Sequence, residues 1–294
     1  MEKKLKVGLQ LYSVRNSMEK DPLGTIEKCV EAGYKYLQIA NGITDTMDKH
    51  DLVCGFGVPA DVFRDTCERL GVKLLASHFM MTNFTPETAR DICKAQKEIG
   101  VDGLITPIQF ASTPAEVQMV CDECNRLGEI CAEEGMSYFY HNHSHEFQLI
   151  DGKTFFDRLM EGTDPNLVKL ELDTYWATRG GVDPIQIMKD LGERCTLLHQ
   201  KDYPKGYEDE LVQYPLLEVG KAVDLDYFTS QTNPAHFVEI GTGILDIQSI
   251  IDTAVELDCY DYIILEQDYT ALDEIESIKV SMESFKKYNN VTFS

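Results

Sequence analysis

The stretch VKLELD at residues 168–173 alternates apolar and charged residues and ends in an acid. Because successive side chains of a β-strand point to opposite faces, its valine and leucines share one face, while Lys169, Glu171 and Asp173 share the other. In a closed barrel of parallel strands, one face packs against outer helices and the other points to the barrel axis. The pattern therefore predicts a barrel strand that carries Glu171 and Asp173 towards the axis.

Short runs of this kind recur along the chain, with helical segments between them. We expect strands near Val7–Tyr12, Tyr36–Ile39, Lys73–His78, Gly103–Thr106, Ser137–Asn142, Val168–Asp173, Thr196–Gln200 and Tyr262–Glu266. Proline near the start and glycine just past the end are typical of helices. Such signals are Pro22, Pro59, Pro86 and Pro114 at the starts and Gly33, Gly71, Gly100 and Gly135 at the ends.

The rhythm of these segments decides the fold class. Strand and helix alternate eight times at a spacing of roughly 30 residues, which favours a closed barrel over an open doubly wound sheet. No G-x-G-x-x-G follows the first strand, so a dinucleotide-binding fold is disfavoured. The sequence predicts an α/β fold, a single (β/α)8 TIM-barrel domain over residues 1–294.

One stretch, at about residues 202–243, breaks the rhythm. It follows the seventh predicted strand and has no clear helix or strand pattern. Loops of this length in compact domains are usually functional or partly structured. We expect it at the C-terminal face of the barrel, where it can wall in a substrate or meet a partner subunit.

Charge and hydropathy exclude several classes of function. Fifty acidic residues against 27 basic ones give a net charge of −23, which repels a phosphate backbone and excludes sequence-independent nucleic-acid binding. The longest apolar runs are far too short to span a bilayer, so no membrane partner is expected. The N-terminus shows no secretory apolar region, and we expect a cytoplasmic protein.

The cysteines point to a reducing compartment and carry little chemistry. Their number, nine, is odd, and the chain is too large to need disulfide staples. Cys121 and Cys124 have metal-like spacing, but they fall on the apolar stripe of a predicted helix, and no second pair completes four ligands. We interpret them as core cysteines.

Ionisable residues gather at the C-terminal ends of the predicted strands. Five of the seven histidines lie in these segments, and only His50 and His236 do not. Barrel enzymes keep their active sites at this end of the strands. The residues concerned are His78, the run from His141 to Glu146, Asp173, His199 with Lys201, and Glu266 with Asp268.

Alternation within the strands selects four of these residues as a metal site. His199 and Lys201 share a face, as do Ile264 and Glu266. Glu146, Asp173, His199 and Glu266 then converge from neighbouring strands. Three carboxylates and one imidazole suit one divalent cation with open positions, namely Mn²⁺, Mg²⁺, Co²⁺ or Zn²⁺. The alternative is a polar interior of internal ion pairs, for example between Lys169 and Glu171.

At these residues the chain resembles the sugar phosphate isomerase/epimerase family of xylose-isomerase-like TIM barrels. The closest likeness is to its branch of inosose dehydratases and keto-sugar epimerases and hydratases. The similar segments span most of the chain in the family's order: residues 8–15, 140–147, 172–177, 199–202, 239–243 and 265–268. Gln38, where many relatives carry an acid, and His145, where they are more often apolar, depart from the pattern.

The resemblance implies roles for individual residues. The family's metal ligands map onto Glu146, Asp173, His199 and Glu266, and its acid/base pair onto Glu146 and Glu266. It also implies substrate contacts from Arg15, His78, His141, His143, Trp176 and Lys201. Four of these six have a structural alternative: core histidines bonded to carbonyls for His78 and His143, packing for Trp176, and an ion pair for Arg15.

The resulting hypothesis is a metal-dependent isomerase or epimerase of a keto-sugar or related polyol. A divalent ion acidifies the C–H next to a carbonyl and holds the enediolate, while Glu146 or Glu266 takes the proton. Protonation of a leaving hydroxyl would instead make a dehydratase or hydratase of an inosose or 3-keto-sugar. We expect a small uncharged sugar or cyclitol as substrate and, by family analogy, a homo-oligomer.

Three other classes fit less well. A non-catalytic sugar-binding barrel would not need four intact ligands. An apurinic endonuclease needs a metal cluster and a basic groove, which a net charge of −23 does not suggest. A nicotinamide-dependent reductase lacks a visible cofactor motif.

Overall fold

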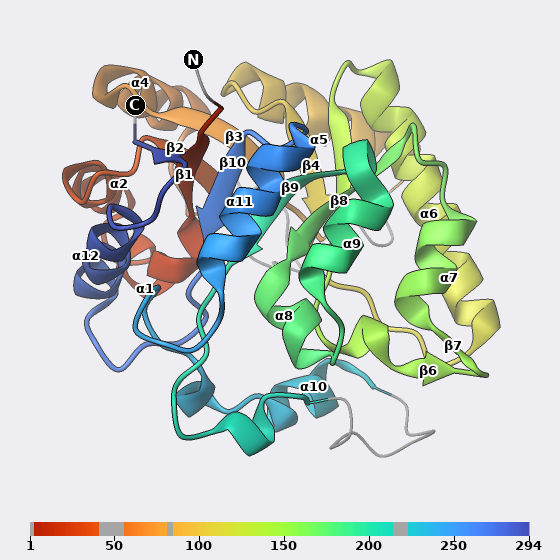
Figure 1. Ribbon diagram of the computed structural model, residues 1–294. Coiled ribbons are helices and arrows are strands. Elements are labelled where there is room, and N and C mark those ends of the chain that lie inside the picture. Colours follow the sequence, from red (N-terminus) through yellow and green to blue (C-terminus); the bar gives the residue numbers. More distant parts are fainter. Residues whose placement is uncertain (1–2, 41–55, 81–84, 214–222, 294) are drawn as a thin grey trace.

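Eight parallel strands of the described residues form a closed barrel (Figure 1). The computed structural model describes residues 3–40, 56–80, 85–213 and 223–293. The barrel strands are β1 Leu5–Gln10, β2 Tyr36–Ala40, β3 Lys73–His78, β4 Gly103–Thr106, β5 Ser137–His141, β8 Val168–Asp173, β9 Cys195–Gln200 and β10 Tyr262–Leu265. Pairing of β10 with β1 closes the barrel, and β11 (Val291–Thr292) adds to β1. The predicted barrel is confirmed.

The predicted strands agree with the observed ones, with one shift. The first was expected at Val7–Tyr12 but ends at Gln10. The Gln10 side chain accepts a hydrogen bond from the Tyr12 N–H and caps a 3₁₀ turn, η1 (Leu11–Val14), so the chain leaves the sheet two residues early. This turn leads into the short helix α1 (Arg15–Met18).

Helices surround the barrel and follow the expected start and stop signals. The outer helices are α2 Pro22–Glu31, α4 Ala60–Leu70, α5 Pro86–Glu98, α6 Pro114–Glu133, α7 Phe155–Gly162, α9 Pro184–Leu191, α11 Ile247–Leu257 and α12 Glu274–Phe285. Pro22, Pro86 and Pro114 occupy first-turn positions. Gly71 ends α4 with φ +67°, a left-handed conformation that glycine adopts without strain. A hairpin of β6 (Leu149–Ile150) and β7 (Lys153–Thr154) precedes α7.

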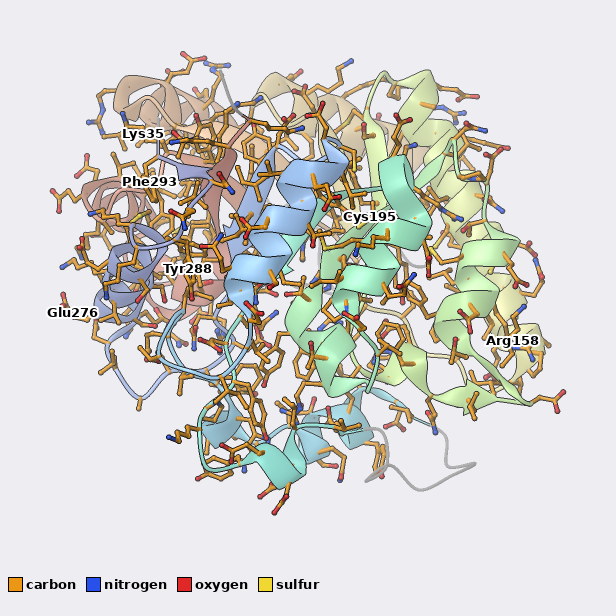
Figure 2. All side chains as sticks on the ribbon, viewed as in Figure 1. Lys35, Arg158, Cys195, Glu276, Tyr288 and Phe293 are labelled. Atoms are coloured by element: carbon orange, nitrogen blue, oxygen red, sulfur yellow. The ribbon has the colours of Figure 1, made fainter. Side chains whose placement is uncertain are left out.

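The core has two layers, one on each face of the sheet. Val168, Leu170 and Leu172 of β8 belong to the large apolar cluster between strands and helices. Glu171 and Asp173 of the same strand are fully buried on the opposite, inner face. The predicted alternation of β8 is therefore confirmed. Figure 2 shows the contrast between buried and exposed side chains, with Cys195 inside on β9 and Glu276 outside on α12.

The cysteines that the structure describes are free thiols, as expected. Cys121 and Cys124 are buried in the outer core, on the inner side of α6. No cysteine of the described residues belongs to a group that could hold a metal. The described helices include none that is long and apolar enough to cross a membrane.

The predicted loop at residues 202–243 is partly helical. It contains the 3₁₀ turns η4 (Glu208–Glu210) and η6 (Pro234–His236) and the helix α10 (Leu225–Gln231). Residues 214–222 lie outside the described part of the chain, as does His50. In Figure 1, α10 lies beyond the C-terminal ends of the strands, and β1 begins at the opposite end of the barrel. The loop therefore covers the face on which the site was predicted.

Asp202 ties the two ends of this loop together. Its carboxylate accepts hydrogen bonds from the backbone N–H groups of Tyr203, Gly241, Gly243 and Leu245 at 2.9–3.1 Å. A side chain at position 243 would have no room, because a Cβ there would lie 2.3 Å from the Asp202 carboxylate and the Tyr203 carbonyl. The glycine thus permits the close approach on which this anchor depends.

We predict that Asp202→Ala lowers the free energy of unfolding by about 2–4 kcal/mol, because four N–H groups lose a charged acceptor at a mostly buried position. Urea denaturation measures the change. The matched control is Asp209→Ala, at an exposed position of the same loop, which should change stability by less than about 0.5 kcal/mol. Equal effects of the two substitutions would contradict the anchoring role.

Candidate active site

Four ionisable side chains meet at the C-terminal ends of neighbouring strands. His141, Asp173, His199 and Glu266 come from β5, β8, β9 and the end of β10, and possible metal-ligand atoms from all four lie within 4.8 Å of one another. All four residues are buried. Three of them, Asp173, His199 and Glu266, belong to the set that the sequence predicted. The described structure places His141, expected as a substrate contact, in the fourth position, where Glu146 was expected.

Glu146 lies outside this group. It sits in the 3₁₀ turn η2 (His145–Phe147), beyond the end of β5. One carboxylate oxygen accepts a hydrogen bond from the Tyr140 hydroxyl and the other from the His143 N–H, each at 2.9 Å. These contacts hold the turn after β5, and Glu146 is not among the residues that the structure brings together in this group.

The signal for His141 was present in the sequence. Phe139 belongs to the apolar cluster inside the barrel, and His141 stands two positions later on the same strand. Period-two alternation therefore aims both side chains at the axis. Glu146 follows five residues after the strand ends, where alternation no longer specifies a direction.

A backbone hydrogen bond fixes the orientation of the His141 ring. Its Nδ1–H donates to the Pro107 carbonyl at 3.1 Å, so Nε2 is the nitrogen that points into the group. That Nε2 is buried and, among the described residues, makes no hydrogen bond. It faces Asp173 Oδ2 at 3.5 Å and Glu266 Oε2 at 3.9 Å. An imidazole nitrogen beside two acid oxygens is a donor set that fits a divalent cation, and the backbone bond on the other nitrogen is the usual support of a metal-binding histidine.

Lys201 reaches into the same group. Its ammonium bonds to Asp173 Oδ2 and, at 2.5 Å, to Glu266 Oε2, and Asp268 Oδ1 lies 3.6 Å away. Burial alone would lower the pKa of Lys201, but the three carboxylates raise it well above its usual value. Burial raises the pKa of Asp268 to about 7. Asp268, at the rim of the group, was not among the predicted site residues.

A second polar layer lies beneath the four residues. Glu171 Oε2 is 2.7 Å from His78 Nε2, and Glu171 Oε1 accepts from the Gln38 side chain at 2.5 Å. His199 Nε2 donates to Gln38 Oε1 at 2.6 Å, while its Nδ1 is 3.0 Å from Glu266 Oε2. Glu171 is therefore paired with His78 and, at 3.3 Å, with His199. It does not form the internal ion pair with Lys169 that the alternative interpretation predicted.

Burial and neighbouring charges shift the pKa values of the two histidines of this layer in opposite directions. Burial lowers the pKa of His78 despite its contact with Glu171. Burial also opposes the charge on His199, but Glu171 and Glu266 outweigh it and raise the pKa of His199 to about 10. In the metal-free protein, His199 is therefore an imidazolium and His78 a neutral ring.

His143 and Trp176 form an aromatic wall beside the group. The His143 ring lies 5.0 Å from that of His141 and 5.4 Å from that of Trp176, and Lys201 Nζ lies 5.8 Å from the Trp176 ring. Burial lowers the pKa of His143 well below its usual value. His143 Nδ1 and Trp176 Nε1 are buried without a hydrogen-bond partner among the described residues. Phe228 of α10 packs against both rings at 5.3–5.5 Å.

Arg15 lies at the rim of the group. Its guanidinium donates to the carbonyls of Tyr12 and Asp268 at 3.0 and 2.7 Å and stacks 4.2 Å from the Tyr12 ring. These contacts fix Arg15 beside the acidic residues. They also engage the guanidinium with the protein itself.

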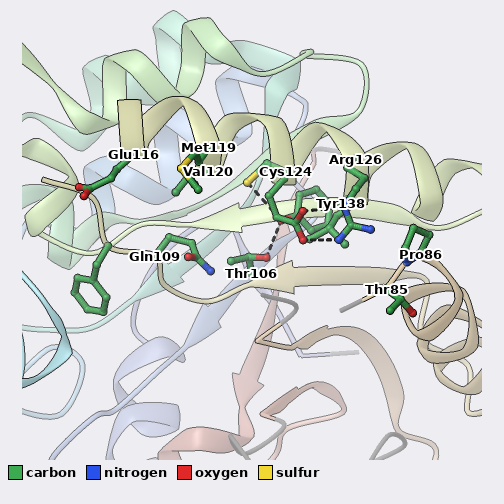
Figure 3. A pocket seen from close by; sticks show the side chains of 13 residues that line it. Thr85, Pro86, Thr106, Gln109, Glu116, Met119, Val120, Cys124, Arg126 and Tyr138 are labelled. Atoms are coloured by element: carbon green, nitrogen blue, oxygen red, sulfur yellow. Dashed lines mark hydrogen bonds and ion pairs between the residues drawn. The ribbon is translucent and has the colours of Figure 1, made fainter. Parts of the chain in front are cut away.

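A cavity of about 550 Å³ lies elsewhere, between α6 and the strands β4 and β5 (Figure 3). Its polar wall is a hydrogen-bonded chain of Thr106, Tyr138 and Cys124. None of the predicted site residues lines it. This cavity is therefore separate from the buried ionisable group.

The match to a family model agrees with this geometry. Residues 26–288 match the model described as the xylose isomerase-like TIM barrel. The chain belongs to this family. The resemblance inferred from the sequence is thereby confirmed.

The curated relatives of this chain include inosose dehydratases. An inosose dehydratase of Geobacillus kaustophilus is 33% identical over 156 residues, which cover 53% of this chain and 47% of the relative. The chain spans about half the length of the curated relatives that it matches.

Solved structures share the barrel over most of their length. A sugar phosphate isomerase/epimerase from Parabacteroides distasonis is 22% identical and superposes with a TM-score of 0.74, covering 99% of this xylose isomerase-like chain and 96% of the other. The IOLI protein with a bound zinc atom is 16% identical, with a TM-score of 0.63 and 96% coverage of each chain. At these identities the likeness is one of fold.

We predict that the stability of the metal-free protein falls as the pH rises from about 6.5 to about 10, because the pKa of His199 is raised on folding from 6.5 to about 10. The contribution of His199 is complete below the unfolded pKa and is lost as the pH passes the folded pKa. Chemical denaturation in the presence of EDTA at several pH values measures it. The slope should be shallower in His199→Gln, and equal slopes would contradict the assignment.

Proposed function

We propose that this xylose isomerase-like barrel is a divalent-metal-dependent enzyme that removes a proton next to the carbonyl of a keto-sugar or keto-cyclitol. The observation that carries the proposal is the buried Nε2 of His141, which makes no hydrogen bond among the described residues and faces two acid oxygens. The names of the relatives support a substrate of this class, since one is an inosose dehydratase and another a sugar phosphate isomerase/epimerase.

His141, Asp173, His199 and Glu266 would hold the metal ion. Two carboxylates and two imidazoles suit Mn²⁺, Co²⁺ or Zn²⁺, and Mg²⁺ less well because it prefers oxygen ligands. When bound, such an ion polarises a carbonyl and stabilises the negative charge that develops after proton removal. The bound zinc of the IOLI protein supports a metal in this fold.

Glu266 is the proposed proton acceptor. Its Oε2 contacts Lys201 and His199, whereas no hydrogen bond from the described residues engages its Oε1. The lysine and imidazolium keep the carboxylate ionised, and they hold its pKa well below the usual value against the opposing effect of burial. A fixed carboxylate with one free oxygen is suited to accept a proton from carbon.

Lys201 and Asp268 lie next to Glu266 and are the proposed proton donors. Asp268 is partly protonated near neutral pH because burial raises its pKa to about 7. Protonation of a leaving hydroxyl group by either residue, with the carbon-bound proton on Glu266, completes the loss of one water molecule. Dehydration is therefore the first candidate reaction, and the dehydratase relative supports it.

Epimerisation or isomerisation is the second candidate. The sugar phosphate isomerase/epimerase neighbour supports it. It shares proton removal by Glu266 with dehydration but returns the proton to carbon. Glu146, the other acid predicted for this proton transfer, is held by hydrogen bonds from Tyr140 and His143. Lys201 or Asp268 is therefore the proposed donor that returns the proton to carbon.

The proposed substrate is uncharged. Lys201 is surrounded by three carboxylates, and Arg15 is engaged by two backbone carbonyls. Both cations thus already have partners within the protein, which favours a neutral substrate. His143 Nδ1 and Trp176 Nε1 need partners, and the hydroxyl groups of a sugar or cyclitol would supply them once Phe228 gives access.

We predict that Glu266→Gln lowers the rate of substrate deuterium exchange in D₂O by about 10²–10⁴-fold, the usual contribution of a general base. Glu146→Gln makes the same chemical change outside the group and should retain exchange within about tenfold. NMR detects the exchange on a panel of inososes and 3-keto-sugars, with Mn²⁺ or Zn²⁺ supplied. Release of water from the product separates dehydration from epimerisation.

The opposite ranking of the two variants would contradict the assignment of Glu266. Turnover of phosphorylated sugars in preference to neutral ones would contradict the substrate class. Binding of sugars without exchange or turnover on any of them, by metal-loaded protein, would favour a non-catalytic barrel.

A further inference from the structure

The ammonium of Lys201 occupies the centre of the acidic group. Lys201 is fully buried, and its two shortest ion pairs are with Asp173 Oδ2 and Glu266 Oε2. A buried lysine with two carboxylates in direct contact exchanges its hydration for those contacts. The two acids are therefore neutralised from within the protein.

The same two oxygen atoms complete the candidate metal group. Glu266 Oε2 is 3.0 Å from His199 Nδ1 and 3.9 Å from His141 Nε2, and Asp173 Oδ2 is 3.5 Å from His141 Nε2. A cation coordinated by these nitrogens and oxygens would take the contacts that Lys201 now makes. An ammonium and a divalent ion in contact with the same two oxygens would repel each other strongly.

A third carboxylate and an aromatic ring also lie near the Lys201 ammonium. Asp268 Oδ1 lies 3.6 Å from its Nζ, and the face of Trp176 lies 5.8 Å away. An acid and an aromatic ring both stabilise an ammonium. The lysine can therefore give up Asp173 and Glu266 and still keep a charged partner.

We propose that Lys201 is an internal cation that competes with the divalent metal for Asp173 and Glu266. Metal binding then requires the ammonium to withdraw towards Asp268. The inference rests on the metal site of the proposed function, but it concerns metal affinity and not turnover. Lys201 then sets how tightly the site takes a metal ion, in addition to its proposed role as a proton donor.

The competition has a consequence for the working site. In the metal-free protein both acids are satisfied by the lysine, so their mutual repulsion is compensated without any bound ion. In the metal-bound protein the displaced ammonium adds a positive charge beside the carboxylates. The site then holds a divalent ion and the lysine, where the metal-free site had the lysine and the His199 imidazolium.

The test compares the dissociation constants for Zn²⁺ of wild type, Lys201→Met and Lys169→Met, by competition with a chromophoric chelator. Methionine keeps the length of the side chain and removes its charge. Lys201→Met should bind Zn²⁺ at least about tenfold more tightly, because the internal competitor is gone. Lys169, half-buried on β8 without an ion pair to a described carboxylate, is the matched control and should change affinity less than about twofold.

Lys201→Met leaves two acids uncompensated, so its metal-free form can be poorly folded. Thermal unfolding with and without Zn²⁺ then provides the second measurement, and the metal should raise the Tm of the variant more than that of the wild type. Binding by the variant alone would also support the competition.

Equal or weaker Zn²⁺ binding by Lys201→Met, with no larger rise in Tm, would overturn the inference. The proposed function would stand in that case if the wild type binds the metal and turns over its substrate. Tighter binding by the variant, combined with a metal-loaded wild type that is inactive on every substrate, would leave the inference intact and overturn the function.

Discussion

The central constraint on this barrel is the burial of carboxylates that have no access to water. Asp173 and Glu266 are nearly or fully inaccessible at the ends of β8 and β10, the two strands that flank β9. Removing an ionised carboxylate from water costs several kcal/mol even after the protein relaxes, unless a cation compensates. In the described structure Lys201 and the His199 imidazolium provide this compensation. Every other feature of the site depends on how those positive charges are arranged.

The layer below shows how the arrangement is held. Glu171 lies between His78 and His199, whose rings stack at 5.2 Å and 10°. Gln38 bonds to Glu171 and to His199, so it fixes which nitrogen of His199 faces Glu266. A glutamate at position 38, as the family resemblance leads one to expect, would place a second acid against Glu171 and raise the electrostatic cost of this layer. The neutral amide avoids that cost and still accepts the proton of His199.

The barrel and three of the four members of the group could be predicted from sequence, because both depend on short-range patterns. Alternation on β8 and β9 correctly aimed Asp173 and His199 at the axis, since period two follows from strand geometry alone. The same rule applied to β5 would have selected His141. Glu146 was assigned by extending the same alternation beyond the strand and by the family resemblance, but it lies in a turn after β5, and its carboxylate bonds to Tyr140 and His143.

The contacts that could not be predicted are those that depend on tertiary distance. Lys201 was expected to touch a substrate, and nothing in the sequence around it indicates two ion pairs with residues 28 and 65 positions away. The helix α10 and the four-way anchor at Asp202 were likewise hidden within a stretch that lacks periodicity. Sequence alternation specifies the direction in which a side chain points. Its partners across the barrel depend on the length of that side chain and on the distances between strands.

Charge balance links these observations to the chemistry. Removal of a proton from a neutral keto-sugar creates an anion, and an anion is stabilised only where positive charge is already fixed in place. In the metal-free group, Lys201 and His199 are matched by Asp173, Glu266 and Glu171, so little positive charge is left for a substrate. A divalent ion that takes over the carboxylates would reverse this balance and release the ammonium. The same buried acids would thus suppress anion stabilisation without the metal and permit it with the metal.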